Sequence, residues 1–397
     1  MNSGFIRMQG LAHPPRSETN PMTTRLIIAA LIAAIFLPSC SHPSSESAIS
    51  AGGDTLTVHS SLLTMIDYPQ GGTTLVEIRN PWDSTGVLSR MALVPRDSSV
   101  PEWLPADYAV VRTPVRRMAV FSGVHTSALV ELGGTDALAA VADGGFFAPD
   151  DTVSALLREG RVADVGAAAS PSVEKLTASR VEAVLLSPMQ GQKLPQLPRG
   201  TCAVEMADYL ETTPIGRAEW ILLIGKLLGK YDEAAQIFKG VVDEYNALQF
   251  KAALCSTLPL VITETEYAGT WYVPAGESYM SRMISDAGAR TPWTGTPGTG
   301  SLSLDMARVL ADGIDADFWL IRTYGSEPTL AGLKAANPLN AKFKAFREGG
   351  VYGCDSSVRP IFNDVAFHPE RVLADMVAIF HPSLMPGYEP QYYRKAE

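Results

Sequence analysis

The distribution of hydrophobic and polar positions divides the chain into segments of different periodicity. Residues 54–115 carry short runs of strand-like composition, interrupted by turn signals at 69–72 and at 80–81. We expect a small antiparallel sheet here and call this segment the preface. Over 116–213 short apolar runs alternate with stretches of helical periodicity, and the same alternation returns over 255–397. Strands that alternate with helices predict parallel sheets covered by helices.

The longest helical pattern, residues 214–254, separates these two α/β segments. Pro214 suits a first helical turn, and Gly229 with a turn near Tyr231 predicts a division into two helices. The expected fold class is therefore α/β, with two three-layer α/β lobes joined by a helical connector and preceded by the β-rich preface. In the second lobe we expect helices over 301–313 and 368–380 and extended pieces over 351–354 and 359–363.

The beginning of the chain has the pattern of a secretory signal. The apolar run 26–37 follows Arg25 and is shorter than the roughly 20 residues that a membrane-spanning helix needs. The next residues complete the motif LPSC, which resembles the lipobox of bacterial lipoproteins and implies lipidation of Cys40. We therefore expect a signal peptide over 1–40, with Met22 as an alternative start, and a flexible Ser-rich tether over 41–53. The other interpretation is an ordinary cleaved signal in which Cys40 is incidental.

Composition and motif content narrow the functional classes. The formal net charge of -10 and the absence of a Lys/Arg-rich run argue against a nucleic-acid-binding protein. The chain has no GxSxG, GxxxxGK[ST], GxGxxG or HExxH motif, so we expect no catalytic residue, no resident metal and no cofactor. Cys202, Cys255 and Cys354 lie far apart, and two of them could form a disulfide whose pairing the sequence leaves open.

Six stretches between about residues 110 and 385 resemble, in order, the substrate-binding proteins of ATP-binding-cassette importers for iron chelates and cobalamin. They are RMAVFSGVHTSALVELGGTDALAAVAD, SPSVEKLTASRVEAVLLSP, YLETTPIGRAEWILLIGKLLGKYDEAAQIF, GTWYVPAGESYMSRMISDAGA, SLSLDMARVLADGIDADFWLI and FHPERVLADMVAIFHPSLMP. The resemblance implies two lobes that face each other across a cleft and a rigid helix that joins them. The preface resembles an addition found in some lipoprotein members.

The same resemblance implies a function. It implies capture of an iron chelate (siderophore or haem) or a cobalamin-type corrinoid, and delivery to the permease and ATPase subunits of an importer. The lipid anchor would hold the protein on the periplasmic side of a cell-envelope membrane. We keep two alternatives open: a surface-anchored hydrolase or chelate-processing enzyme, and a stand-alone chelate scavenger. Turnover of a substrate would favour the enzyme.

The resemblance also implies two residues for docking on the permease. In the family each lobe presents an acidic residue near the start of a helix, and the matching positions here are Glu174 and Asp305. A carboxylate can form a bidentate pair with an arginine of a partner. The family usually has Glu where this chain has Asp305, which shortens the reach. Acidic residues are also favoured in a first helical turn by the helix dipole alone.

Candidate ligand-binding residues come from the loops at the carboxyl ends of the predicted strands, including 362–364. These loops are rich in aromatic residues, which suit a large planar or macrocyclic ligand; each of them could instead fill the core. Arg322 could meet a negative chelate. His125 stands just after the first predicted strand of the lobe, where it could contact a ligand or serve as an axial metal contact; the alternative is a histidine at a helix start or on the surface. His368 and His381 flank the closing helix, where we expect structural roles. The aromatic candidates are Phe146, Phe147, Tyr267, Trp271, Tyr272 and Tyr324, with the Trp271-Tyr272 pair favoured by the resemblance.

Overall fold

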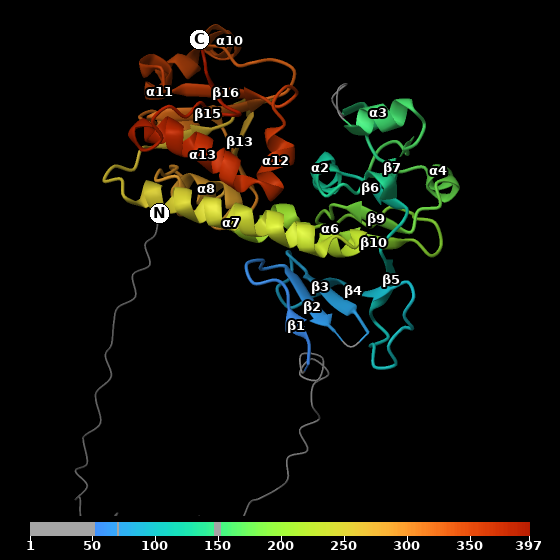
Figure 1. The fold of residues 1–397 in the computed structure, drawn as a ribbon. Coiled ribbons are helices and arrows are strands. Elements are labelled where there is room, and N and C mark those ends of the chain that lie inside the picture. Colours follow the sequence, from blue (N-terminus) through green and yellow to red (C-terminus); the bar gives the residue numbers. More distant parts are fainter. Residues whose placement is uncertain (1–51, 70, 147–151) are drawn as a thin grey trace, which may run out of the picture. The chain divides into compact units, whose positions relative to one another are not determined.

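The computed structural model describes residues 52–69, 71–146 and 152–397 (Figure 1). The predicted signal peptide, Cys40, nearly all of the predicted tether and Phe147 lie outside these residues. Within the described part of the chain, no helix has both the length and the apolar character needed to cross a bilayer.

The preface forms one five-stranded sheet in sequence order. Its strands are β1 (Asp54–Thr55), β2 (Leu63–Tyr68), β3 (Thr73–Arg79), β4 (Val87–Pro95) and β5 (Ala109–Thr113). Neighbours from β1 to β4 are antiparallel, whereas β4 and β5 are parallel. The expectation of a wholly antiparallel sheet was therefore wrong at this edge. The reason is the long connection 96–108, since a crossover of about a dozen residues is what a parallel pair requires.

The N-terminal lobe is built on a parallel sheet with the order β10-β9-β6-β7-β8. Buried strand residues such as Ala119, Ala140 and Val184 are small or β-branched, as expected for a sheet covered on both faces. The strands are β6 (Met118–Val120), β7 (Leu138–Val141), β8 (Ala163–Asp164), β9 (Ala183–Leu186) and β10 (Cys202–Glu205), and the helices are α2 (Gly123–Glu131), α3 (Thr152–Arg158) and α4 (Val173–Ala178).

The connector consists of α5 (Pro214–Ala218), α6 (Ile221–Leu228) and the long helix α7 (Tyr231–Ala253). Gly229 ends α6 in a left-handed conformation with φ of 70°, as the sequence pattern predicts, because this conformation is strained for any residue with a Cβ. In Figure 1, α7 runs below the helices α8 and α13 of the C-terminal lobe and continues toward the N-terminal lobe.

Two buried glutamates of the connector region hold the preface. The Glu219 carboxylate accepts hydrogen bonds from the backbone N–H groups of residues 58–60 at 2.7 to 2.9 Å. The Glu211 carboxylate accepts from the backbone of residues 61 and 62 and from the Trp220 indole. Lys226 adds an ion pair with Asp67 at 2.8 Å. A carboxylate buried without a cation needs several donors, and the backbone of the preface supplies them.

The C-terminal lobe has two sheets. The first has the order β11-β15-β16-β17 and is parallel except for β17, and the second is the antiparallel sheet β12-β13-β14. The strands are β11 (Val261–Thr263), β12 (Glu266–Tyr267), β13 (Thr270–Pro274), β14 (Ser301–Leu304), β15 (Phe318–Thr323), β16 (Val351–Asp355) and β17 (Arg394–Lys395). The helices are α8 (Tyr279–Asp286), α9 (Met306–Gly313), α10 (Leu330–Ala336), α11 (Lys344–Glu348), α12 (Ile361–Phe367) and α13 (Pro369–Phe380).

Two elements of this lobe differ from the sequence prediction. Residues 301–304 form strand β14 instead of the first turn of a helix, because SLSL alternates with period two and pairs with β13. Residues 361–367 form helix α12 instead of an extended piece, with Ile361 and Val365 buried one turn apart. Short 3-10 turns cover Thr135–Ala137, Gly144–Phe146, Asp208–Leu210, Pro338–Lys342 and Pro382–Leu384.

Candidate functional site

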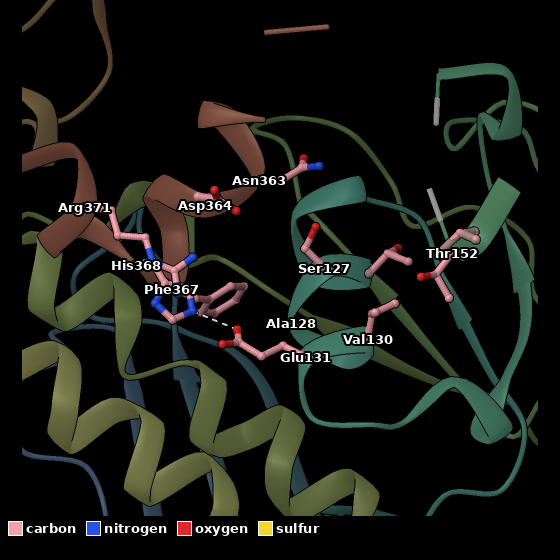
Figure 2. Close-up of a pocket in the computed structure, with 12 residues that line it drawn as sticks. Ser127, Ala128, Val130, Glu131, Thr152, Asn363, Asp364, Phe367, His368 and Arg371 are labelled. Carbon is pink, nitrogen blue, oxygen red and sulfur yellow. Dashed lines mark hydrogen bonds and ion pairs between the residues drawn. The ribbon is translucent and has the colours of Figure 1, made fainter. Parts of the chain in front are cut away.

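A pocket of about 250 Å³ lies between the two lobes (Figure 2). The N-terminal lobe lines it with α2 and the start of α3, and the C-terminal lobe lines it with α12 and the start of α13. Helix α2 follows strand β6 and α12 follows strand β16, so the first turn of each helix lies at the carboxyl end of a parallel strand, and the pocket residues lie further along the two helices. The carboxyl ends of the strands form the edge at which α/β sheets bind ligands. The lining residues include Thr126, Ser127, Glu131, Asn363, Asp364, His368 and Arg371.

A histidine connects the two lobes at this pocket. The His368 ring lies between two carboxylates, with Nε2 2.7 Å from Glu131 and Nδ1 3.0 Å from Glu370. Burial alone lowers the pKa of His368, but the hydrogen bonds to Glu131 and Glu370 outweigh it and raise the pKa to about 9. The same contact with His368 lowers the pKa of Glu131. A structural role was predicted for His368 from the sequence, and in the structure its partner Glu131 belongs to the opposite lobe (Figure 2).

The neighbouring residues pack α12 against α2. Phe367 is 2% exposed and belongs to the hydrophobic cluster of the N-terminal lobe, although α12 comes from the C-terminal lobe. Its ring centroid lies 6.4 Å from that of His125. A Cβ at Gly123 would lie 3.3 Å from the Asn363 amide oxygen, so the glycine permits this close approach. The lobes are thus in direct contact beside the pocket.

His125 lies inside the protein rather than at a ligand surface. It is 1% exposed, and its Nε2 is 2.8 Å from Asp208, which also accepts from Arg217 Nε at 3.0 Å. Burial opposes ionisation of Asp208, but His125 and Arg217 outweigh it and lower the pKa of that carboxyl. The Arg217 guanidinium lies 4.6 Å from the ring centroid of Tyr279 in the C-terminal lobe. His125 therefore belongs to a buried polar network that reaches from one lobe to the other.

Trp271, the favoured aromatic candidate, lies in the core of the C-terminal lobe. It is 0% exposed, stacks on Trp319 with ring centroids 5.6 Å apart, and meets Phe343 edge to face. Its indole N–H donates to the carbonyl oxygen of Thr263 at 2.8 Å. The core interpretation therefore holds for Trp271 in this structure, and its ring presents no face to a ligand.

Three predicted tyrosines are exposed. Tyr267 is 77% exposed and Tyr324 67% exposed, and Tyr272 is about half exposed. Tyr267 and Tyr272 lie on the small antiparallel sheet, and Tyr324 follows β15. The backbone of Phe146 ends a 3-10 turn after β7, while its side chain and Phe147 lie outside the described part.

Arg322 is the next-to-last residue of strand β15, and its charge is paired. Its guanidinium makes a two-point contact with the Glu264 carboxylate, with Nε at 2.8 Å. Burial opposes its charge, but Glu264 outweighs this and the pKa of Arg322 is raised. The guanidinium also lies 5.0 Å from the ring centroid of Phe362, which is 45% exposed. The loop 362–364 was expected at the cleft, but Glu264 and the Phe362 ring were not identified from the sequence.

The two predicted docking residues are both exposed, but they occupy different positions in their helices. Glu174 lies in the first turn of α4, two residues after the N-cap Ser172. Asp305 is itself the N-cap of α9 and accepts a hydrogen bond from the Arg308 backbone N–H at 2.7 Å. The carboxylate of Asp305 therefore has a capping role that Glu174 does not have.

Cys202, Cys255 and Cys354 are free thiols, so no two of them form a disulfide. Within residues 52–69, 71–146 and 152–397, no group of three or more His, Cys, Asp or Glu side chains is arranged to hold a metal ion.

Comparison with known proteins places the chain in a family. Residues 128–358, more than half of the chain, match the family model described as periplasmic binding protein, and the chain belongs to this family. It is similar to an uncharacterized lipoprotein of Methanocaldococcus jannaschii, with 25% identity over 79% of this chain and 77% of the relative.

Solved structures show the same fold at lower identity. A periplasmic haem-binding protein from Pseudomonas aeruginosa matches with a TM-score of 0.54 and 17% identity, covering 71% of this chain and 98% of that chain. A protein of an Fe3+-hydroxamate transport system from Saccharomonospora viridis matches with a TM-score of 0.51 and 16% identity, covering 68% and 94%. The two-lobe α/β fold predicted from the sequence is thus confirmed.

Proposed function

We propose that this protein is the substrate-binding component of an ATP-binding-cassette importer. It captures an iron chelate (siderophore or haem) or a cobalamin-type corrinoid between its lobes and delivers it to a permease. The observation that carries this proposal is the pocket lined by helices that follow parallel strands in both lobes. Structures of similar fold come from haem-binding and Fe3+-hydroxamate transport proteins. The protein itself catalyses no reaction in this proposal.

The exposed tyrosines provide the ligand-stacking surface in this proposal. Tyr267 and Tyr272 lie on the small antiparallel sheet β12-β13-β14, and Tyr324 directly follows β15. None of the three is among the residues that line the 250 Å³ pocket, so this surface would extend the binding site beyond it. A planar chelate or a corrin ring gains both apolar burial and ring stacking on such side chains. Arg322 contributes through its stacked pair with Phe362 more than through free charge, because Glu264 neutralises it.

We further propose that the protein is exported and held at a membrane by a lipid on Cys40. The relative from Methanocaldococcus jannaschii is described as a lipoprotein, and the sequence LPSC has the lipobox pattern. Cleavage before Cys40 and labelling of that residue by a radioactive fatty acid in cells would test this assignment. A Cys40→Ser variant that still labels would contradict it.

The proposed function is tested by calorimetric titration of the purified protein with haemin, a ferric hydroxamate and cyanocobalamin in turn. We expect saturable binding of one class, weakened about threefold to tenfold by Tyr267→Ala or Tyr324→Ala. Phe250→Ala is the matched control, because Phe250 is an aromatic residue of the connector that is 69% exposed. Binding of none of the three classes, or equal losses in all three variants, would contradict the proposal.

A further inference from the structure

We propose that His368 is a positioning residue that sets the separation of the lobes, and with it the ligand surface, by bridging Glu131 and Glu370. We call Glu131, Phe367, His368 and Glu370 the interlobe brace. The inference rests on the proposed function, because the brace lies at the same interlobe pocket. The inference names the residues that fix α12 relative to α2, the helices that form the two walls of that pocket.

The first argument is the position of α12, which joins the brace to the ligand surface. This short helix begins at Ile361 and ends at Phe367. Phe362 near its start is exposed beside Arg322, and His368 directly after its end contacts the opposite lobe. A helix of two turns moves as one body, so the contact at His368 fixes where Phe362 and Asn363 stand relative to the N-terminal lobe.

The second argument concerns direction. Phe367 supplies apolar contact with the N-terminal lobe, and apolar contact is non-directional. The pocket of about 250 Å³ lies beside it, so apolar packing between α12 and α2 is interrupted on that side. His368 instead contacts one carboxylate through each ring nitrogen, and such charge-assisted contacts fix the ring in distance and orientation. The brace therefore holds α12 in place where packing alone would not.

The third argument is chemical. An imidazolium donates through both nitrogens, whereas a neutral imidazole donates through one only. The charged groups in direct contact with His368 are Glu131 on α2 and Glu370 on α13, and Arg371 lies 3.5 Å from Glu370. The other titratable groups of the neighbouring elements have partners of their own: Asp364 on α12 accepts from the Tyr392 hydroxyl, and His125 on α2 pairs with Asp208. The two carboxylates in direct contact keep His368 protonated through the neutral range. Deprotonation leaves one of the two carboxylates without its donor.

The first experiment follows the brace without any ligand. Histidine NMR of the whole protein gives the titration midpoint of His368, assigned by its loss in His368→Gln. We expect a midpoint near 9 that falls by at least one unit in Glu131→Gln. We expect amide deuterium exchange at pH 7 to become about tenfold faster in His368→Gln and in Glu131→Gln, in both segments 361–367 and 126–131. The variant that carries both substitutions should exchange little faster than either single variant. Lys239→Gln, which breaks an exposed ion pair on α7, is the control and should change neither segment.

The second experiment measures ligand affinity with haemin and with a ferric hydroxamate. We expect His368→Gln and Glu131→Gln to weaken binding about tenfold at pH 7, while Lys239→Gln binds as the wild type does. Raising the pH from 7 to 9.5 should weaken wild-type binding and leave that of His368→Gln nearly unchanged.

The outcomes separate the two proposals. Exchange that rises in 361–367 alone, or affinity that is unchanged in the variants, would show a local structural role and overturn the brace. Failure of both probes to bind the wild type counts against the proposed function, and the exchange and titration results then still decide the brace. Should His368→Gln fail to fold, Glu131→Gln carries the test, because the Glu131 side chain is 35% exposed and its substitution disturbs less packing.

Discussion

The two lobes share an α/β plan, but they fill it with side chains of different size. The N-terminal sheet buries alanines and valines, while the C-terminal lobe buries Trp271, Trp319 and Phe343 in one cluster. Each buried indole needs an acceptor. The end of β11 provides two, since Thr263 and Glu264 accept from Trp271 and Trp319 through consecutive carbonyl oxygens. Glu264 has φ of 64°, so the chain turns away from the strand at this point. An aromatic residue after a strand can therefore belong to the core when such carbonyls are within reach.

The largest expected effect is a difference in the free energy of unfolding between Trp271→Ala and Tyr324→Ala. Trp271→Ala removes a fully buried indole, and we expect it to lower the free energy of unfolding by about 3–5 kcal/mol. Tyr324→Ala removes an exposed ring, and its cost should stay within about 0.5 kcal/mol. Urea denaturation of both variants measures the difference. Similar losses in the two variants would mean that Trp271 is not a core residue.

A smaller expected effect is the pH dependence of stability that comes from the contact of His368 with Glu131 between the lobes. The pKa of His368 is raised in the folded protein from an ordinary 6.5 to about 9, so its contribution is fully present below pH 6.5 and is lost as pH rises through 9. We expect the wild type to lose about 2–3 kcal/mol relative to His368→Gln between these pH values. Denaturation of both proteins from pH 6 to 9.5 gives this difference directly. A difference that stays constant over the range, or grows with pH, would contradict the assignment.

The smallest effect separates the two predicted docking residues. Asp305→Ala removes an N-cap and should cost about 1 kcal/mol, whereas Glu174→Ala should stay within about 0.5 kcal/mol. If both residues dock on a permease, each variant should reduce uptake of the ligand in cells while leaving its binding unchanged. Uptake assays beside calorimetry test this. Asp305→Asn retains a capping oxygen and removes the charge, so it distinguishes the two roles of Asp305.

The fold could be predicted from the sequence because buried apolar residues recur at regular intervals along each strand and helix. Alternation of strands and helices in 116–213 and 255–397, and the long helical pattern of 214–254, predicted two lobes and a connector. The prediction was wrong at 301–304, where the period-two run SLSL precedes Asp305, the N-cap at which helix α9 begins, and at 361–367, where a helix follows Pro360.

The candidate site was harder to predict because its contacts are distant in sequence. His125 contacts Asp208, Arg322 contacts Glu264, and His368 contacts Glu131 across 237 positions. Whether Trp271 turns inward depends on the carbonyl oxygen of Thr263, which has no sequence signal of its own. Residues whose role needs no distant partner, such as the exposed Tyr267 and Tyr324, could be proposed from their place after strands.

The attachment of the preface has a mechanical consequence. Five backbone N–H groups of residues 58–62 are held by the carboxylates of Glu211 and Glu219, next to the helices of the connector. Tension applied to the chain ahead of β1 would therefore reach the connector through these hydrogen bonds, and this route includes neither α2 nor α12. If the proposed lipid on Cys40 anchors the protein, a pull on this end of the chain would act on the connector and would not separate the two walls of the interlobe pocket.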